Sequence, residues 1–496
     1  MKRYDVWIQK IKDAVYPDFP YDPPKGYPEL LGLDYMMQYN SNNEIYTAVR
    51  EILYQMGFDR ENYGTAMWNP LRGVVVEGNT VLIKPNFVRG THIWGEQGVQ
   101  AMITNLSVIR PIIDYVLLAS QGNVRIIVGD APMRGSDWDA IVKNSKVQRL
   151  ISFYRDKGYQ IELIDFRKDL TINNKEQVYE KTVANPSRTP QDYVEIDIGH
   201  DSMLDEIIDS NYNFEMGGVK RGTISRYHNE RHNTYLFPRE ALEADVFINV
   251  PKLKTHRMAG LTCAMKNLIG INGEKERIAH YRRGVKNQKS DEFEKFYLKI
   301  YLRERIWTFL KAIEQPWSRQ IMTWGKKFVQ KYIWAGKTFE ETYALNPPKE
   351  YREGGWKGND TLWRCAMDIN RILLYADREG KMHDKPQRQY LCVVDAVIAG
   401  EGEGPLANTP KKAGVVMGGL NPVMVDYAAA QLMCFDYRML PMIKRAFEPH
   451  KFPLINRKPK EVQIGSNVAE DEYCTDFVPT SGWSALFQSR KNNKLE

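Results

Sequence analysis

Short apolar segments alternate with amphipathic segments through most of the chain, and this alternation constrains the fold more than any other feature. Apolar residues recur at helical spacing over 43–58, 105–121 and 147–158, and short buried-strand patterns lie at 81–83, in "NVRIIVGDAP" and in "YQIELIDF". Helices and strands that alternate at this spacing indicate a parallel sheet covered by helices. We therefore predict an α/β fold, with a mostly parallel sheet and helices on both faces.

The rest of the chain extends this pattern and suggests a division into parts. Further strands are predicted at 193–198, 244–250, 390–400 and 413–420. A helix is predicted at 421–433, and we interpret its first residue, Asn421, as the helix cap. The predicted parts are an N-terminal arm (1–42), an α/β domain (43–290 and 350–440), a helical insertion (291–349) and a C-terminal extension (441–496).

The insertion departs from the rest of the chain in composition. Residues 295–337 combine Trp307, Trp317, Trp324 and Trp334 with many lysines and arginines and only two acidic residues. The main interpretation is a helical lid whose aromatic side chains pack on the domain. The second is an amphipathic element that binds an anionic membrane surface. Nucleic-acid stacking is a lesser option, because no module that reads nucleic acid accompanies the segment, and we expect no specific nucleic acid.

Composition narrows the class of protein. The 496 residues carry a formal net charge of +7, which is too small an excess to indicate nucleic-acid binding. The five cysteines are scattered without a Cys-x-x-Cys pair, so neither a disulfide framework nor an iron–sulfur cluster is predicted. The N-terminal sequence does not resemble a secretory signal, and no run of about 18 apolar residues occurs. A cytoplasmic protein, with membrane association left open, is the expectation.

Polar side chains follow four of the predicted strands. Ligands of open parallel sheets bind beyond the carboxyl ends of the strands. Loops after strands are commonly polar, but four such ends together predict one cleft. Its walls would be formed by Lys84 and Asn86, by Asp130, by Lys252, Lys254 and His256, and by Asp395, Glu401 and Glu403.

The segment 249–280 supplies the richest of these ends. Lys252, Lys254 and Arg257 suit an anionic group of the substrate, such as phosphate or carboxylate. His256 and His280 could carry protons or ligate a divalent metal ion, although no His-x-x-x-His spacing supports the metal. Lys266 could act as a base or an amine nucleophile, or it could be a structural lysine paired with an acid.

These residues resemble the domain-of-unknown-function family 362. The matching pieces, in family order, are "VLIKPNF", "IIVGDAP", "ADVFINVPKLKTHRMAGLTCAMKNLIGI", "VVDAVIAGEGEGP" and "NPVMVDYAAAQLM". They cover roughly residues 78 to 435. Many relatives carry a ferredoxin-like cysteine cassette, which this chain lacks, so the resemblance does not imply electron transfer. The family has no agreed activity.

A more distant likeness concerns the order of His256, Lys266 and His280. This order looks like the central part of the lactate racemase family, in which histidines and a lysine hold a nickel-pincer cofactor. The loops "KPNF" and "GDAP" replace the patterns of the racemases, so neither cofactor nor substrate carries over. The likeness implies that the three side chains face one cleft.

The function predicted from the sequence is that of a cytoplasmic enzyme acting on an anionic small molecule or sugar conjugate. The predicted catalytic residues are His256, Lys266, His280 and Asp130, and a metal, if bound, would use His256 and His280. The predicted substrate-binding residues are Lys84, Asn86, Lys252, Lys254, Arg257, Asn267, Asp395, Glu401 and Glu403. The alternative is a non-catalytic accessory protein that docks on a membrane through residues 295–337 and serves a lipid-linked or surface-polymer pathway.

Overall fold

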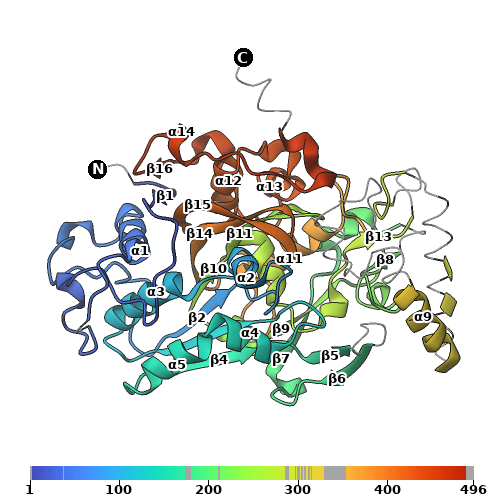
Figure 1. Cartoon of the computed structure of the whole chain (residues 1–496), viewed down its shortest axis with the longest axis horizontal. Helices are drawn as coiled ribbons and strands as arrows, with labels where there is room; N and C mark the ends of the chain where they lie inside the picture. Colours follow the sequence, from blue (N-terminus) through green and yellow to red (C-terminus); the bar gives the residue numbers. More distant parts are fainter. Residues whose placement is uncertain are drawn as a thin grey trace.

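A ten-stranded sheet forms the centre of the molecule (Figure 1). The structure is a computed structural model. It describes residues 3–36, 38–173, 180–209, 213–284, 290–295, 298, 302, 305–306, 309–310, 313, 316–328 and 353–487. From edge to edge the sheet runs through β16 (Ile464–Ser466), β1 (Val6–Lys10), β15 (Ala407–Gly419), β14 (Gln389–Glu403), β10 (Val246–Val250), β2 (Thr80–Pro85), β3 (Arg125–Asp130) and β4 (Ile161–Asp165). The strands β11 (Lys252–His256) and β12 (Gly260–Thr262) join it beside β14.

Most neighbouring strands of this sheet are parallel. β4, β3, β2, β10 and β14 run in one direction, whereas β15 returns antiparallel to β14. Parallel neighbours need crossover connections, which are usually helical. The fold is therefore α/β with a mostly parallel sheet, as the alternation predicts.

Successive residues of the central strands point into two different apolar cores. In β2, Val81 and Ile83 lie in one core and Leu82 lies in the other, as the two-residue period of a strand requires. Helices line both cores, so both faces of the sheet are covered. The first core includes α1 (Glu44–Gln55), α3 (Leu106–Ala119) and α5 (Val147–Arg155), and the second includes α7 (Ala264–Asn267), α11 (Leu362–Tyr375), α12 (Pro422–Leu432) and α13 (Pro441–Ala446).

Side-chain caps fix the starts of two of these helices. The side chain of Asn43 accepts a hydrogen bond from Tyr46 N at the start of α1. Asn421 caps α12 in the same way by accepting from Val423 N and Met424 N, which confirms the interpretation of Asn421 as a cap. The remaining α-helices that the structure describes are α2 (Gly95–Met102), α4 (Trp138–Ser145), α6 (Arg239–Glu243), α9 (Pro316–Phe328) and α14 (Glu470–Tyr473).

Three two-stranded sheets lie outside the central sheet. They pair β5 (Asp169–Asn173) with β6 (Glu180–Ala184), β7 (Tyr193–Asp197) with β9 (Thr234–Pro238), and β8 (Phe214–Glu215) with β13 (Tyr281–Arg282). The strand predicted at 193–198 therefore exists, but it belongs to an antiparallel pair and does not continue the parallel rhythm.

The two ends of the described chain differ from the sequence prediction, because both contribute strands to the central sheet. Within the predicted N-terminal arm, β1 pairs antiparallel with β15. Within the predicted C-terminal extension, β16 pairs parallel with β1. The residues before α1 are thus partly a sheet strand, and only the remainder lies over the domain as an arm.

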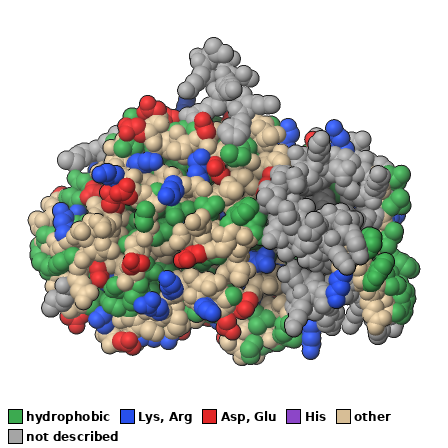
Figure 2. Space-filling view, in the orientation of Figure 1, with side chains coloured by type: hydrophobic (Ala, Val, Ile, Leu, Met, Phe, Trp, Pro, Cys, Tyr) green, Lys and Arg blue, Asp and Glu red, His purple; other side chains and the backbone are tan. Residues whose placement is uncertain are grey.

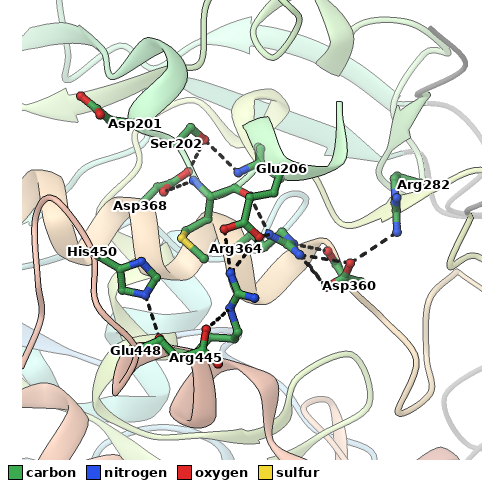
Figure 3. A network of polar contacts seen from close by, with 12 residues as sticks. Asp201, Ser202, Glu206, Arg282, Asp360, Arg364, Asp368, Arg445, Glu448 and His450 are labelled. Atoms are coloured by element: carbon green, nitrogen blue, oxygen red, sulfur yellow. Dashed lines mark hydrogen bonds and ion pairs between the residues drawn. The ribbon is translucent and has the colours of Figure 1, made fainter. Parts of the chain in front are cut away.

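A polar network joins the C-terminal extension to α11 (Figure 3). Arg364 on α11 donates to Glu206 Oε2 at 2.7 Å and to the Met203 carbonyl oxygen at 2.8 Å. Arg445 on α13 donates to the same Glu206 carboxylate at 2.7 and 2.8 Å. Glu206 therefore bridges two arginines on two helices and ties the extension to the domain.

The described part of the insertion contains α9, a helix as predicted, whereas its residues 329–349 lie outside the described residues. Among the described residues no single helix is long and apolar enough to cross a membrane. α2 and α3, bent by 42°, meet the length and composition requirement only as a pair.

Candidate functional site

An ion pair joins the carboxyl ends of β2 and β3. Lys84 Nζ donates to Asp130 Oδ1 at 2.8 Å, to the Pro85 carbonyl oxygen at 2.8 Å and to Asn267 Oδ1 at 3.3 Å. Asp130 also accepts from Phe87 N at 2.6 Å. Lys84 has no exposed surface and all three of its ammonium hydrogens have acceptors. The sequence predicted Lys84 for substrate binding and Asp130 for catalysis. Both roles stay predictions, and in this structure the two side chains bind each other and neighbouring protein groups.

A second ion pair joins the first residue of β11 to the middle of β14. Lys252 Nζ donates to Asp395 Oδ2 at 2.6 Å, to the hydroxyl of Tyr16 at 2.6 Å and to the Ile398 carbonyl oxygen at 3.2 Å. Asp395 also accepts from Asn105 N at 2.8 Å. Both charged side chains are wholly buried, and burial lowers the pKa of Lys252. All three ammonium hydrogens of Lys252 thus have acceptors within the protein. None is left for the substrate anion that the sequence predicts at Lys252.

Lys254 differs because it has no carboxylate within ion-pair distance among the described residues. Its Nζ donates to Asn86 Oδ1 at 2.6 Å and to the Met102 carbonyl oxygen. Burial first, and then the charges of Lys252 and Lys266, lower its pKa well below the ordinary value. A buried cation with only neutral acceptors favours a negative partner.

A chain of buried amides continues from Lys254 across the strand ends. Asn86 Nδ2 donates to Asn267 Oδ1 at 2.7 Å, and Asn267 Nδ2 donates to Asn249 Oδ1 at 2.7 Å. Asn249 Nδ2 then donates to the Tyr390 hydroxyl at 2.8 Å. These hydrogen bonds fix the orientation of each side-chain amide, so Asn86 presents its Oδ1 to Lys254.

Lys266 lies on the short helix α7 and is half-buried. Its side-chain amine makes no hydrogen bond or ion pair with any residue that the structure describes. Burial lowers the pKa of its ammonium group to about 8, with Lys84 adding to the effect and Cys365 opposing it. A lysine amine with this pKa is partly uncharged near neutral pH, which suits a base or nucleophile.

His256 and His280 lie in the neighbourhood of Lys266, because the charge of Lys266 contributes to the pKa of both rings and the charge of His280 contributes to that of His256. Burial, reinforced by Lys266, Arg257 and Lys254, lowers the pKa of His256 well below its usual range. Burial likewise lowers the pKa of His280 to about 4. Both rings are therefore neutral at pH 7.

The hydrogen bonds of the two rings assign opposite tautomers. His256 Nδ1 lies 3.1 Å from Met258 N and accepts its hydrogen, so the ring proton of neutral His256 is on Nε2. His280 Nδ1 lies 2.9 Å from the Ile278 carbonyl oxygen and donates to it, so His280 Nε2 keeps its lone pair. One ring offers a donor and the other an acceptor.

Two glutamates of the last part of β14, Glu401 and Glu403, lie at the edge of this region. Glu401 accepts from Lys411 Nζ and Val478 N, both at 3.0 Å, and is thereby occupied. Glu403 accepts from Ser481 N, while its Oε2 is buried without a hydrogen bond, and burial raises its pKa. Arg257 pairs with Glu353 at 3.2 Å.

The metal prediction has little support from this geometry. Within the described ranges, no group of three or more histidine, cysteine, aspartate or glutamate side chains is arranged to hold a metal ion. The assignment of a metal ion to His256 and His280 stays a prediction.

Sequence reasoning missed three residues of the network. Tyr16 reaches Asp395 and Lys252 from the predicted arm, and Thr104 Oγ1 accepts from Asn86 N and donates to the Val250 carbonyl oxygen. Asn249 was visible as a polar residue in the apolar strand "VFINV", which is the signal that could have marked it. Tyr16 and Thr104 carry no local signal.

A cavity of about 260 Å³ adjoins this network on the side of the N-terminal arm. Its walls include Tyr16, Phe19, Asn105, Lys146 and Arg149. The Tyr16–Asp395–Lys252 contacts lie between its wall and the strand ends, so the cavity is not part of the Lys266 cluster.

The fold and the site together define an α/β protein in which lysines, histidines and amides gather at the carboxyl ends of a mostly parallel sheet. The family model described as "Domain of unknown function (DUF362)" matches residues 81–198 and 200–431, and the chain belongs to this family. No curated protein matches the chain.

One solved structure among the matches is a crystal structure of a Thermotoga maritima protein from structural genomics. It is 11% identical, the match covers 82% of this chain and 59% of that one, and the TM-score is 0.32. The likeness to the lactate racemase family stays a prediction.

Proposed function

We propose that this protein is an enzyme that binds an anionic small molecule beside Lys254 and Lys266 and carries out acid/base chemistry on it. The observation that carries the proposal is a pair of neighbouring lysines, each without a carboxylate within ion-pair distance in the described part of the chain. Two buried or half-buried cations without counter-charges are costly in the empty protein. A phosphate or carboxylate group of a substrate would supply the missing charge.

The neighbouring groups suit proton transfer. In its amine form Lys266, with a pKa of about 8, can accept a proton from the bound substrate. His256 Nε2–H can donate a hydrogen bond to an oxygen on which negative charge develops, and His280 Nε2 can accept one. The buried pairs Lys84–Asp130 and Lys252–Asp395 hold the surrounding strand ends in place.

Pyridoxal 5′-phosphate is a suitable probe because it joins an aldehyde to a phosphate. The Lys266 amine would attack the aldehyde carbon, and loss of water would leave an imine that borohydride reduces to a stable secondary amine. We expect Lys266 to be the main labelled residue in peptide mapping, with a reaction rate that rises with pH around 8. Inorganic phosphate should protect it.

Matched reagents and variants make this test decisive. Pyridoxal lacks the phosphate and should label Lys266 roughly tenfold more slowly than pyridoxal 5′-phosphate. A tenfold difference corresponds to about 1.4 kcal/mol of binding free energy from the phosphate. Lys254→Met should remove the preference for the phosphorylated reagent, and Lys266→Met should abolish the labelling. The exposed Lys385 is the internal reference. Equal labelling of Lys266 and Lys385, with no protection by phosphate, would overturn the proposal.

A further inference from the structure

One face of α9 displays large apolar side chains to solvent. Trp317, Ile321, Trp324 and Phe328 are 50%, 48%, 69% and 44% exposed. Their spacing of four, three and four residues places them on one side of the helix. The rings of Trp324 and Phe328 stack at 5.7 Å between centroids. Trp324 and Phe328 thus form a continuous aromatic surface.

A different side of α9 is the buried one. Ser318 and Met322, which lie four residues apart on another side of the helix, are buried. The helix therefore already has a buried side, and its most apolar side is the one left outside. Figure 2 shows hydrophobic side chains gathered at the end of the molecule where α9 lies.

A second set of exposed apolar residues precedes α9 in the insertion. Leu298, Leu302, Ile306 and Phe309 are between 51% and 66% exposed. Their spacing of four, four and three residues is again that of one helical face. With the α9 face, eight large apolar side chains from one short stretch of sequence face solvent.

The charge of the same stretch is strongly positive. Residues 295–337 contain ten lysines and arginines and two acids, Glu304 and Glu314, a net charge of +8. The whole chain carries +7, so the remaining residues, with 59 basic and 60 acidic side chains, are almost neutral. The net positive charge of the protein therefore resides in the segment that carries the exposed tryptophans.

We propose that the exposed apolar side chains of α9, together with Leu298, Leu302, Ile306 and Phe309, dock on an anionic lipid bilayer. Tryptophan prefers the headgroup level of a bilayer, and lysine and arginine are attracted by anionic headgroups. A second copy of this chain is the less suitable occupant, because pairing two such faces would bring two segments of charge +8 together. The inference goes beyond the proposed chemistry and does not depend on it.

Vesicle flotation with the full chain tests this inference. The probes are vesicles of phosphatidylcholine alone and of phosphatidylcholine mixed with phosphatidylglycerol. We expect binding to the anionic vesicles to be at least about tenfold stronger than to the neutral ones, because each basic residue near an anionic surface contributes to the attraction. The difference should shrink as salt is raised.

Paired variants separate docking from misfolding. Trp317→Ser combined with Trp324→Ser should weaken vesicle binding about tenfold or more. Trp94→Ser, which removes another exposed tryptophan, should leave binding unchanged. Both variants should keep the circular dichroism spectrum and thermal midpoint of the parent, since the altered side chains lie at the surface and outside the apolar cores.

Three results would overturn the inference. The first is failure of the parent protein to float with anionic vesicles at low salt. The second is unchanged flotation of the Trp317→Ser, Trp324→Ser variant. The third is concentration-dependent dimerisation in sedimentation velocity that this variant abolishes, because that result would assign the face to a second copy of the chain.

Discussion

Lys252 Nζ lies 2.6 Å from Asp395 Oδ2, and neither side chain is exposed to solvent. Removal of one partner leaves the other charge buried and uncompensated, which typically costs about 3–5 kcal/mol. We therefore expect Lys252→Met to lower the free energy of unfolding by about this amount in urea titrations. Adding Asp395→Asn to that variant removes the stranded charge and should recover part of the loss. If Lys252→Met and the parent had the same free energy of unfolding within experimental error, the buried ion pair of Lys252 and Asp395 would be contradicted.

The close approach of Gly270 to the Lys84–Asp130 pair gives a second prediction. A Cβ at Gly270 would lie 2.2 Å from Asp130 Oδ1 and 2.7 Å from Lys84 Nζ. We expect Gly270→Ala to displace the pair and to destabilise the protein by about 1–3 kcal/mol, the usual cost of overpacking. Gly32→Ala, where a Cβ meets nothing within 4 Å, is the matched control and should be nearly neutral in thermal unfolding.

His280 gives a prediction for the pH dependence of stability. Burial lowers its pKa from 6.5 in the unfolded chain to about 4 in the folded protein. Between these values the unfolded state binds more protons, so the free energy of unfolding falls as pH falls from about 6.5 to 4 and this contribution is complete above 6.5. The effect amounts to at most about 3 kcal/mol.

The variant His280→Asn retains a side-chain donor for the Ile278 carbonyl oxygen but cannot titrate. Urea midpoints measured across this range should show a shallower acid loss for His280→Asn than for the parent. Identical slopes for the two proteins would refute the burial of a neutral His280.

Arg364 gives a fourth prediction, because it holds the C-terminal extension through Glu206 (Figure 3). Its side chain is buried, whereas Glu206 is partly exposed, so we expect Arg364→Ala to cost about 2 kcal/mol, between the values for buried and surface pairs. Limited proteolysis should also cut the extension faster. Arg438→Ala breaks an exposed pair with Asp436 and should cost less than about 1 kcal/mol. Equal effects of the two variants would disprove the bridging role.

Local pattern was sufficient to predict the parallel part of the sheet. β2, β3 and β4 are short and apolar, and amphipathic helices separate them, so both the spacing of apolar residues and the segment lengths indicated the correct elements. β10 is likewise a short apolar strand. β11 was missed because its sequence, "KLKTH", contains two lysines, and lysines are almost never fully buried unless paired. Their partners lie far along the chain: Asp395 is 143 residues from Lys252, and Asn86 is 168 residues from Lys254.

The same distance limits what the sequence says about the site. The residue types around His256 and Lys266 predicted a polar region after the strands, and the structure brings His256, Lys266 and His280 together. Contacts between strands that are far apart in the sequence decide which lysine pairs with a carboxylate and which does not. The exposure of Trp324 on α9 likewise follows from which side of the helix meets the domain, and amphipathic spacing alone leaves that side open.

The position of β1 has a consequence for how the chain assembles. β1 is synthesised before its sheet partners β15 and β16, and the Lys10 amide bonds to Asn467 Oδ1, 457 residues later. Contacts at such sequence separation form slowly, because closing a long loop costs entropy before the contact contributes any stability. β1 therefore cannot reach its place until β15 and β16 have been synthesised, and this edge of the sheet closes late in assembly.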